Sequence, residues 1–288
     1  MDLNNDGRRD ILSGSYSRSD GEMAGLFQVL YGAANGKFRK AEVVKGTDGQ
    51  PLIIPADEDQ LIEKICTRPF AVDWDGDGHL DLVVGNFAGS FYWFQGEGQG
   101  KFQPKPKAIL AGKEPLVVDG HHSDPFAIDW DGDGDLDLLS GSGQGGVYLS
   151  ENVAGPRKLP QMRPFQVLIK PGRAIEEGEI LNEDDLKGPT QSTRVWVADV
   201  NGDGKLDLLV GDSVTLIAPA AGVSKEAFKK KHAAWKKALE KASNAVANET
   251  DNEPKEPKAG EDFRSVYEQR TEFMNEDRTG FVWLYLRK

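Results

Sequence analysis

The chain has 288 residues, of which 38% are hydrophobic and 33 are glycine, and its formal net charge is −12. The single cysteine, Cys66, excludes an internal disulfide bond, and no apolar stretch is long enough to cross a bilayer. Basic residues gather in one segment only, which argues against a nucleic-acid ligand. The glycine content favours an all-β repeat protein with many turns.

From the N-terminus onward, one nine-residue pattern recurs four times, at residues 2–10, 73–81, 129–137 and 199–207. The second copy reads DWDGDGHLD, and each copy is followed by an apolar run that ends in glycine, such as residues 82–85. Position 6 is always glycine, because a sharp turn around an ion requires a residue that tolerates positive φ. The spacings of 71, 56 and 70 residues each accommodate one four-stranded blade.

Oxygen-bearing side chains at positions 1, 3, 5 and 9 suit Ca²⁺, a hard cation that takes roughly six to eight oxygen ligands. Position 7 varies freely, which fits a ligand supplied by the backbone carbonyl. The pattern therefore predicts up to four structural Ca²⁺ ions, whose charge would reduce −12 to −4. The predicted ligand residues are Asp2, Asn4, Asp6, Arg8, Asp10, Asp73, Asp75, Asp77, His79, Asp81, Asp129, Asp131, Asp133, Asp135, Asp137, Asp199, Asn201, Asp203, Lys205 and Asp207.

The loops have two alternative interpretations. An EF-hand needs a bidentate glutamate at position 12 and flanking helices. Position 12 is Ser13, Val84, Ser140 or Val210, and the residues that follow each loop are typical of strands. The other interpretation is that the loops are acidic turns without an ion.

The four loops and their flanking strands resemble the FG-GAP/VCBS-type repeats of integrin-α-like β-propellers and of many bacterial secreted proteins. The segment that gives the family its name differs here, as in Gly85-Asn86-Phe87 and Gly141-Ser142-Gly143. The resemblance implies a β-propeller of four blades, and we expect an open seam because the first and last blades lack strands. It also implies a secreted, periplasmic or cell-surface location. No signal peptide precedes the first loop, and we expect the N-terminus to be truncated.

Each blade is expected to have an inner strand before the loop, at residues 68–72, 124–128 and 194–198, and a second strand after it. A third strand follows glycine, at residues 26–31, 90–94 and 147–150. A phenylalanine-centred segment is expected as the fourth strand, at residues 37–39, 101–103 and 164–166. The blades occupy residues 1–223, a helical hairpin 224–277 is inserted in the last blade, and residues 278–288 provide its final strand.

Within the insertion, Phe228, Trp235, Leu239 and Val246 recur at helical spacing after an N-cap at Ser224, and residues 263–273 suggest a second helix. Residues 248–260 are expected to form a loop. Seven lysines lie between residues 225 and 241, so this helix either packs as a plain hairpin or docks an acidic partner.

The loops join the first and second strands, so they share one face, and the long connections at 15–24, 46–67, 111–123 and 172–192 lie on the other. That face should bind a protein or polysaccharide ligand. Trp74 and Trp130 are expected to pack between blades rather than stack on sugars. The alternatives are a polysaccharide lyase or hydrolase, with His121, His122 and Arg68 as weak catalytic candidates, and a structural module of a larger surface protein. Other candidates on this face are Asp57, Glu58, Asp59, Asp124, Arg173 and Arg194.

Overall fold

The computed structural model describes residues 1–16, 24–176, 178–248 and 257–288. Its contacts divide the chain into two compact units. The first comprises Met1–Gly172, Gly188–Ser213 and Phe281–Lys288, and the second comprises Arg173–Lys187 and Val214–Gly280. Most of the connection predicted at 15–24 and most of the loop predicted at 248–260 lie outside the described residues.

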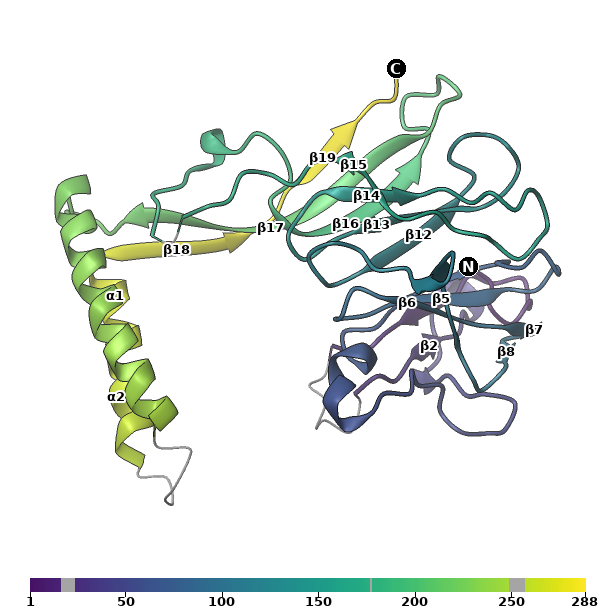
Figure 1. The fold of residues 1–288 in the computed structure, drawn as a ribbon, viewed down its shortest axis with the longest axis horizontal. Helices are drawn as coiled ribbons and strands as arrows, with labels where there is room; N and C mark the ends of the chain where they lie inside the picture. Colours follow the sequence, from purple (N-terminus) through teal and green to yellow (C-terminus); the bar gives the residue numbers. More distant parts are fainter. Residues whose placement is uncertain (17–23, 177, 249–256) are drawn as a thin grey trace. The chain divides into compact units, whose positions relative to one another are not determined.

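The first unit is built from four antiparallel sheets that follow one another in the chain, one for each acidic loop (Figure 1). The first repeat sheet contains β1 (Ile11–Ser13), β2 (Gln28–Leu30) and β3 (Glu42–Val43). The second contains β4 (Arg68–Val72), β5 (Asp81–Gly85), β6 (Phe91–Phe94) and β9 (Lys107–Ala108). The third contains β12 (Asp124–Ile128), β13 (Asp137–Gly141), β14 (Val147–Ser150) and β15 (Gln166–Ile169). The fourth contains β16 (Gln191–Ala198), β17 (Asp207–Pro219) and β19 (Val282–Tyr285).

Short elements connect these sheets within the first unit. They are the two-stranded pairs β7 (Gly96–Gly98) with β8 (Lys101–Phe102) and β10 (Leu110–Ala111) with β11 (Glu114–Pro115), and the 3₁₀ turns η1 (Ala34–Gly36) and η2 (Glu58–Lys64). The expected first, second and third strands are confirmed. The expected fourth strands are wrong in the first two sheets, because the segments 37–39 and 101–103 end before β3 and β9 begin, whereas the third segment, 164–166, reaches the first residue of β15. Phe102 pairs with β7 instead, and the outer strand of its sheet is β9.

Successive repeat sheets pack face to face through three apolar layers. Alternate side chains of a strand point to opposite faces of its sheet, so one strand contributes to two layers. In β5, Leu82 and Val84 join the layer shared with the first repeat sheet, while Val83 joins the layer shared with the third. In the same way, Leu139 of β13 joins the layer shared with the fourth sheet. The two middle sheets are therefore buried on both faces, which explains why their strands are continuous apolar runs.

A backbone joint links each sheet to the next. The glycine that ends β5, Gly85, has no room for a Cβ, because the Ser123 carbonyl oxygen lies 2.4 Å from where that atom would be. Ser123 then accepts the Asn86 N–H on its hydroxyl at 2.8 Å and donates its own N–H to the Asn86 carbonyl at 3.0 Å. Thr67 and Thr193 make the same pair of bonds with Ser15 and Ser142 at the other two junctions.

Each end sheet has an exposed outer face, and that of the fourth sheet is apolar. On the fourth sheet, Trp196 pairs with Leu209, and Leu209 pairs with Leu284. Trp196 is 60% exposed and Leu284 is 50% exposed. On the first sheet, Ile11 is 46% exposed. The fold is thus predominantly β with several antiparallel sheets, as the sequence predicts.

The second unit begins where β17 continues beyond the first unit and pairs with β18 (Met274–Thr279). It contains α1 (Lys225–Asn248), α2 (Pro257–Glu268) and the 3₁₀ turns η3 (Glu183–Asp185) and η4 (Gln269–Glu272). Ser224 caps α1, since its hydroxyl accepts the Ala227 N–H at 3.2 Å. The two helices lie side by side, and the Trp235 indole donates to the Val266 carbonyl at 2.8 Å (Figure 1). Phe228, Trp235, Phe273 and Met274 form the core of this unit. No helix in the described parts of the chain is both long and apolar enough to cross a membrane.

Candidate metal-binding loops

Each acidic loop connects the first and second strands of its sheet and is folded by hydrogen bonds from its own backbone. The position 1 carboxylate accepts the N–H of the position 6 glycine in all four loops, at 2.7 to 3.0 Å. That glycine requires a left-handed conformation, with φ of 92° at Gly78. The position 3 side chain accepts the N–H of position 5, at 2.9 to 3.3 Å. The loops therefore have one common shape.

The aspartate at position 9 joins its loop to the end of the third strand in every repeat sheet. One oxygen of Asp81 accepts the Trp74 N–H at 2.8 Å, and the other accepts the Gly96 N–H at 2.5 Å. Asp10, Asp137 and Asp207 repeat this arrangement in their own sheets. All four carboxylates are buried. Position 9 thus holds the loop and two strands together, in addition to the ligand role predicted from the sequence.

Burial also changes the acidity of two of these groups. Burial raises the pKa of Asp81 and of Asp137 to about 6, and the backbone N–H groups that they accept oppose the shift only in part. The pKa of Asp75 is raised by burial and by the neighbouring Asp77 charge. A bound cation would offset this cost, since it favours the ionised form of each carboxylate.

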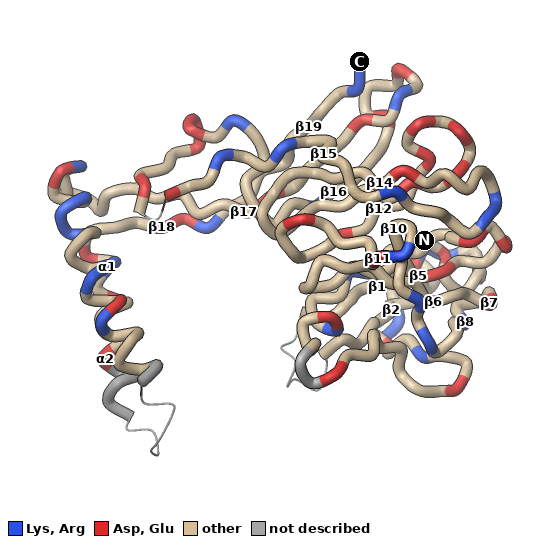
Figure 2. Tube along the Cα trace, in the orientation of Figure 1, with Lys and Arg blue, Asp and Glu red and all other residues tan. Residues whose placement is uncertain are grey.

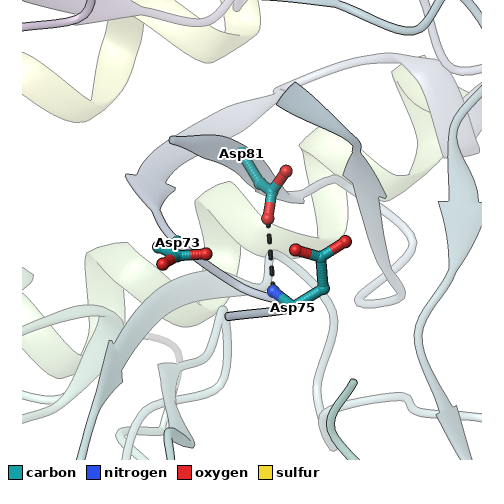
Figure 3. A group of neighbouring side chains, drawn as sticks. All are labelled: Asp73, Asp75 and Asp81. Atoms are coloured by element: carbon teal, nitrogen blue, oxygen red, sulfur yellow. Dashed lines mark hydrogen bonds between the residues drawn. The ribbon is translucent and has the colours of Figure 1, made fainter. Parts of the chain in front are cut away.

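Two of the loops gather three carboxylates each around a common point. Asp73, Asp75 and Asp81 each place an oxygen within 4.8 Å of the others, and Asp129, Asp131 and Asp137 do the same. Figure 3 shows the first of these groups. The Asp73 Oδ1 atom is buried and has no hydrogen-bond partner among the described residues. A buried carboxylate oxygen without a partner is costly, so the donor set fits a hard cation that would satisfy it.

The remaining predicted ligands are less closely gathered. In the first and fourth loops position 3 is Asn4 or Asn201, so these loops offer an amide oxygen in place of the third carboxylate. Position 5 accepts the N–H of position 7 in all four loops. The position 7 side chains of Arg8, His79 and Lys205 are exposed, which agrees with a role for the backbone there, whereas Asp135 is buried. Figure 2 shows the acidic residues gathered in these loops and lysines spread along α1.

The tryptophans at position 2 belong to the core, as predicted. Trp74 and Trp130 are buried in the apolar layers between sheets. The Arg287 guanidinium stacks over the Trp130 ring at 4.6 Å and donates to its carbonyl at 2.7 Å. Arg287 also donates its backbone N–H to Asp207. Sequence reasoning missed this residue, because nothing in the terminal Leu-Arg-Lys segment resembles a motif.

At the other end of the inner strands, a carboxylate lies between two guanidinium groups. Asp124 Oδ1 is 3.6 Å from Arg68 Nε and 3.7 Å from Arg194 Nε. Burial lowers the pKa of Arg68, and the Arg194 charge lowers it further. A left-handed backbone conformation, with φ of 52° to 53°, occurs at Cys66, His122 and Ser192. These residues come directly before Thr67, Ser123 and Thr193, which form the joints between sheets. The sequence placed the three charged residues on one face but did not predict that they meet.

The two candidate histidines pack against one aromatic ring. His121 stacks on Phe87 with 6.3 Å between ring centroids, and His122 meets the edge of the same ring at 4.3 Å. Burial and the charges of Arg68 and Arg194 lower the pKa of His122. In the described chain neither imidazole hydrogen-bonds a carboxylate, and His121 Nδ1 lies 3.4 Å from the Ala88 carbonyl oxygen.

The other candidates of that face lie in separate segments of the chain. Arg173 pairs with Glu179 at 2.6 Å, and both belong to the second unit. Asp57 is exposed before η2, and the side chains of Glu58 and Asp59 lie outside the described part of the chain.

The sheets and loops together define a β-rich repeat protein with acidic, ion-compatible turns. Residues 73–152 match the family model described as an FG-GAP-like repeat, so the chain carries an FG-GAP-type repeat segment. The match contains both three-carboxylate loops and the joint between their sheets. No curated protein matches the chain.

Proposed function

We propose that the chain is a Ca²⁺-stabilised β-propeller module of four FG-GAP-type blades that works outside the cytosol and binds a protein or polysaccharide. Ca²⁺ serves a structural role at the loops, with the ligand residues predicted from the sequence. The observation that carries the proposal is the unpartnered, buried Oδ1 of Asp73 beside Asp75 and Asp81. Extracellular modules hold Ca²⁺ with dissociation constants of about 10⁻⁴ to 10⁻³ M, which suits the Ca²⁺ concentrations outside cells.

The blade arrangement is supported by the joints between sheets. The same hydrogen bonds and the same close glycine contact recur at all three junctions. Because the junctions share one geometry, each sheet should be rotated by a similar angle relative to the preceding sheet. Neighbouring blades of a β-propeller are related in this way. The exposed outer faces of the first and fourth sheets correspond to the open seam of this arrangement.

A thermal melt tests the calcium role. In about 1 mM Ca²⁺, a site with a dissociation constant near 0.1 mM adds about 1.4 kcal/mol to the free energy of unfolding. Several occupied sites should raise the melting temperature well above that measured in excess chelator. Replacing Asp75 and Asp131 with alanine should remove about half of that rise, whereas Asp48→Asn, at an exposed turn, should leave it unchanged. An equal melting temperature with and without Ca²⁺ would contradict the proposal.

The ligand surface that we propose is the strand end opposite the loops, where Arg68, Asp124 and Arg194 meet. Two guanidinium groups share a single carboxylate there, and the Arg194 side chain remains 43% exposed. Such a fork suits a carboxylate, sulfate or phosphate group of a ligand. Arrays of glycans and proteins probed in Ca²⁺ should identify a ligand that Arg194→Ala loses. Arg163→Ala, which removes an exposed arginine paired with Glu151, should retain it.

A further inference from the structure

The fourth repeat sheet lacks the outer strand that the other three sheets have. In those sheets the third strand pairs on its far side with an outer strand, as β2 does with β3, β6 with β9 and β14 with β15. β19 is the third strand of the fourth sheet, and within the described residues it pairs only with β17. One edge of β19 is therefore free.

The pairing of β19 with β17 identifies the backbone groups on this edge. The Asp212 N–H donates to the Phe281 carbonyl at 3.1 Å, so the backbone groups of Phe281 point toward β17. Successive residues of an antiparallel strand point these groups to alternate sides. The N–H and C=O groups of Val282 and Leu284 therefore point away from β17, and the described chain offers them no hydrogen-bond partner. They are available to an added strand.

This edge also lacks the features that normally prevent strand addition. Proteins protect exposed edges with charged side chains and with proline. The outer strand β3 contains Glu42, β9 contains Lys107, and β15 is followed directly by Lys170 and Pro171. β19 reads Val-Trp-Leu-Tyr and has neither a charge nor a proline. The unprotected edge is thus the one that has no outer strand.

β14 shows what kind of strand fits beside β19. Residues 147–149 read Val-Tyr-Leu and residues 282–284 read Val-Trp-Leu. Each stretch begins opposite the glycine that follows the apolar run of its loop, Gly141 in the third sheet and Gly211 in the fourth. The two strands therefore have the same pattern in the same register. A strand like β15, which pairs antiparallel with β14, should pair with β19 in the same way.

The neighbouring sheet leaves space for a single strand. The third sheet extends one strand further than the fourth, because β15 lies beyond β14. Two copies joined edge to edge at β19 would therefore bring the β15 strand of each copy against the third sheet of the other. One added strand would instead cover Leu168 and Ile169, which are partly buried in the same apolar layer as Trp283 and Tyr285. Its residue opposite Trp283 would face this layer, since directly opposed residues share a face of the sheet.

We propose that the free edge of β19 binds one extended segment of a partner polypeptide as the outer strand of the fourth sheet. The segment runs antiparallel to β19 and hydrogen-bonds to the backbone of Val282 and Leu284. It carries aliphatic side chains where it faces the layer of Trp283 and Tyr285. Main-chain bonds supply the affinity and these side chains the specificity, as in other cases of strand addition to a sheet edge. This surface is separate from the ligand surface proposed at Arg194.

The probe is a fluorescent synthetic peptide with the sequence of residues 164–171, PFQVLIKP, which includes β15. Added to the whole chain in Ca²⁺, it should bind with a dissociation constant below about 1 mM, measured by fluorescence anisotropy. Amide hydrogen exchange at Val282 and Leu284 should slow about tenfold or more when the peptide is bound. The same peptide with proline in place of its valine and isoleucine should not bind, because it lacks two N–H donors. The Arg194→Ala chain should bind the peptide as the original chain does, which separates this site from the ligand surface.

Two variants at one position test the role of the backbone. Leu284→Pro removes the N–H that faces the free edge, a place where a strand tolerates proline, and should weaken peptide binding about tenfold or more. Leu284→Ala keeps that N–H and should retain most of the binding. A thermal melt in Ca²⁺ shows whether Leu284→Pro is folded, and the exchange measurement on the original chain needs no variant.

Three results would overturn the proposal. The first is no binding of the peptide at about 1 mM. The second is unchanged exchange at Val282 and Leu284 in the presence of bound peptide, or unchanged binding by folded Leu284→Pro. The third is protection of both amides without peptide together with a dimer in sedimentation, because a second copy of the chain would then occupy the edge.

Discussion

Replacing Asp10 with alanine should destabilise the protein even when no Ca²⁺ is present. Its two carboxylate oxygens accept the Leu3 N–H at 2.7 Å and the Gly32 N–H at 2.8 Å, and both bonds are buried. Alanine leaves both donors unsatisfied. An unsatisfied buried donor costs about 1–3 kcal/mol, so we expect a loss of about 3 kcal/mol in the free energy of unfolding.

The matched control is Asp6→Ala in the same loop. Asp6 is also a predicted Ca²⁺ ligand, but the hydrogen bonds that it makes to Arg8 are exposed. Urea denaturation in excess chelator should therefore show a loss below about 1 kcal/mol for Asp6→Ala. In Ca²⁺, both variants should lose the contribution of the ion at this loop.

Amide hydrogen exchange tests the reasoning at the level of single bonds. In the Asp10→Ala variant the Leu3 and Gly32 amides should lose protection, whereas Asp6→Ala should leave them protected. Two results would contradict this reasoning: an equal loss of stability for both variants in chelator, or continued protection of both amides without Asp10. In either case position 9 would act only as a metal ligand and would not hold the loop and the strands together.

Further predictions concern pH, the second unit and the tail. Because burial raises the pKa of Asp81 and Asp137 to about 6, above the unfolded value near 3.9, the folded chain binds more protons between these values. The stability of Ca²⁺-free protein, measured by urea denaturation, should gain about 1.3 kcal/mol per group as the pH falls from 7 to 5, and Asp81→Asn should reduce the gain. Trp235→Ala should lower the helical circular dichroism signal and cost about 3–5 kcal/mol within the second unit, because a 9% exposed ring and its bond to Val266 are lost. Arg287→Ala should cost about 1–2 kcal/mol by urea denaturation, since the cation–π contact and the bond to the Trp130 carbonyl disappear together; an unchanged midpoint would show that the tail is not docked.

The sequence predicted the elements that depend on local pattern. The nine-residue loops, the strands on either side of them and the helix that begins after Ser224 follow from spacing, turn glycine and alternation, all of which are readable within about ten residues. The family match at residues 73–152 agrees with that part of the prediction. The outer strands of the first two sheets were misplaced, because a two-residue strand such as β9 has no pattern of its own and forms only where β6 offers an edge.

Features that depend on distant partners could not be predicted in this way. The pairing of β18 with the end of β17 joins segments about sixty residues apart and has no alternating apolar signature, since Asn275–Arg278 are all polar. The burial of Asp135 depends on the connection that follows β14, where Gly155 donates to it. In the sequence Asp135 therefore cannot be distinguished from the other aspartates of its loop. The charge cluster at Asp124 depends on three strands meeting side by side.

The glycine joint sets the spacing between neighbouring sheets, whereas the apolar layers beneath it bury the hydrophobic surface. At Gly14, Gly85 and Gly141 the spacing of neighbouring sheets is set by the main chain of the next sheet, which lies where a Cβ would be, and by one hydroxyl group, from Thr67, Ser123 or Thr193. The apolar layers beneath can therefore differ in composition, with two tryptophans in the layer of Trp74 and Trp93 and two phenylalanines in contact at Phe27 and Phe94. In evolutionary terms, mutations could accumulate in each layer without altering the angle at which the next sheet is added. An array assembled in this manner can lengthen by duplication before its interior has been refined.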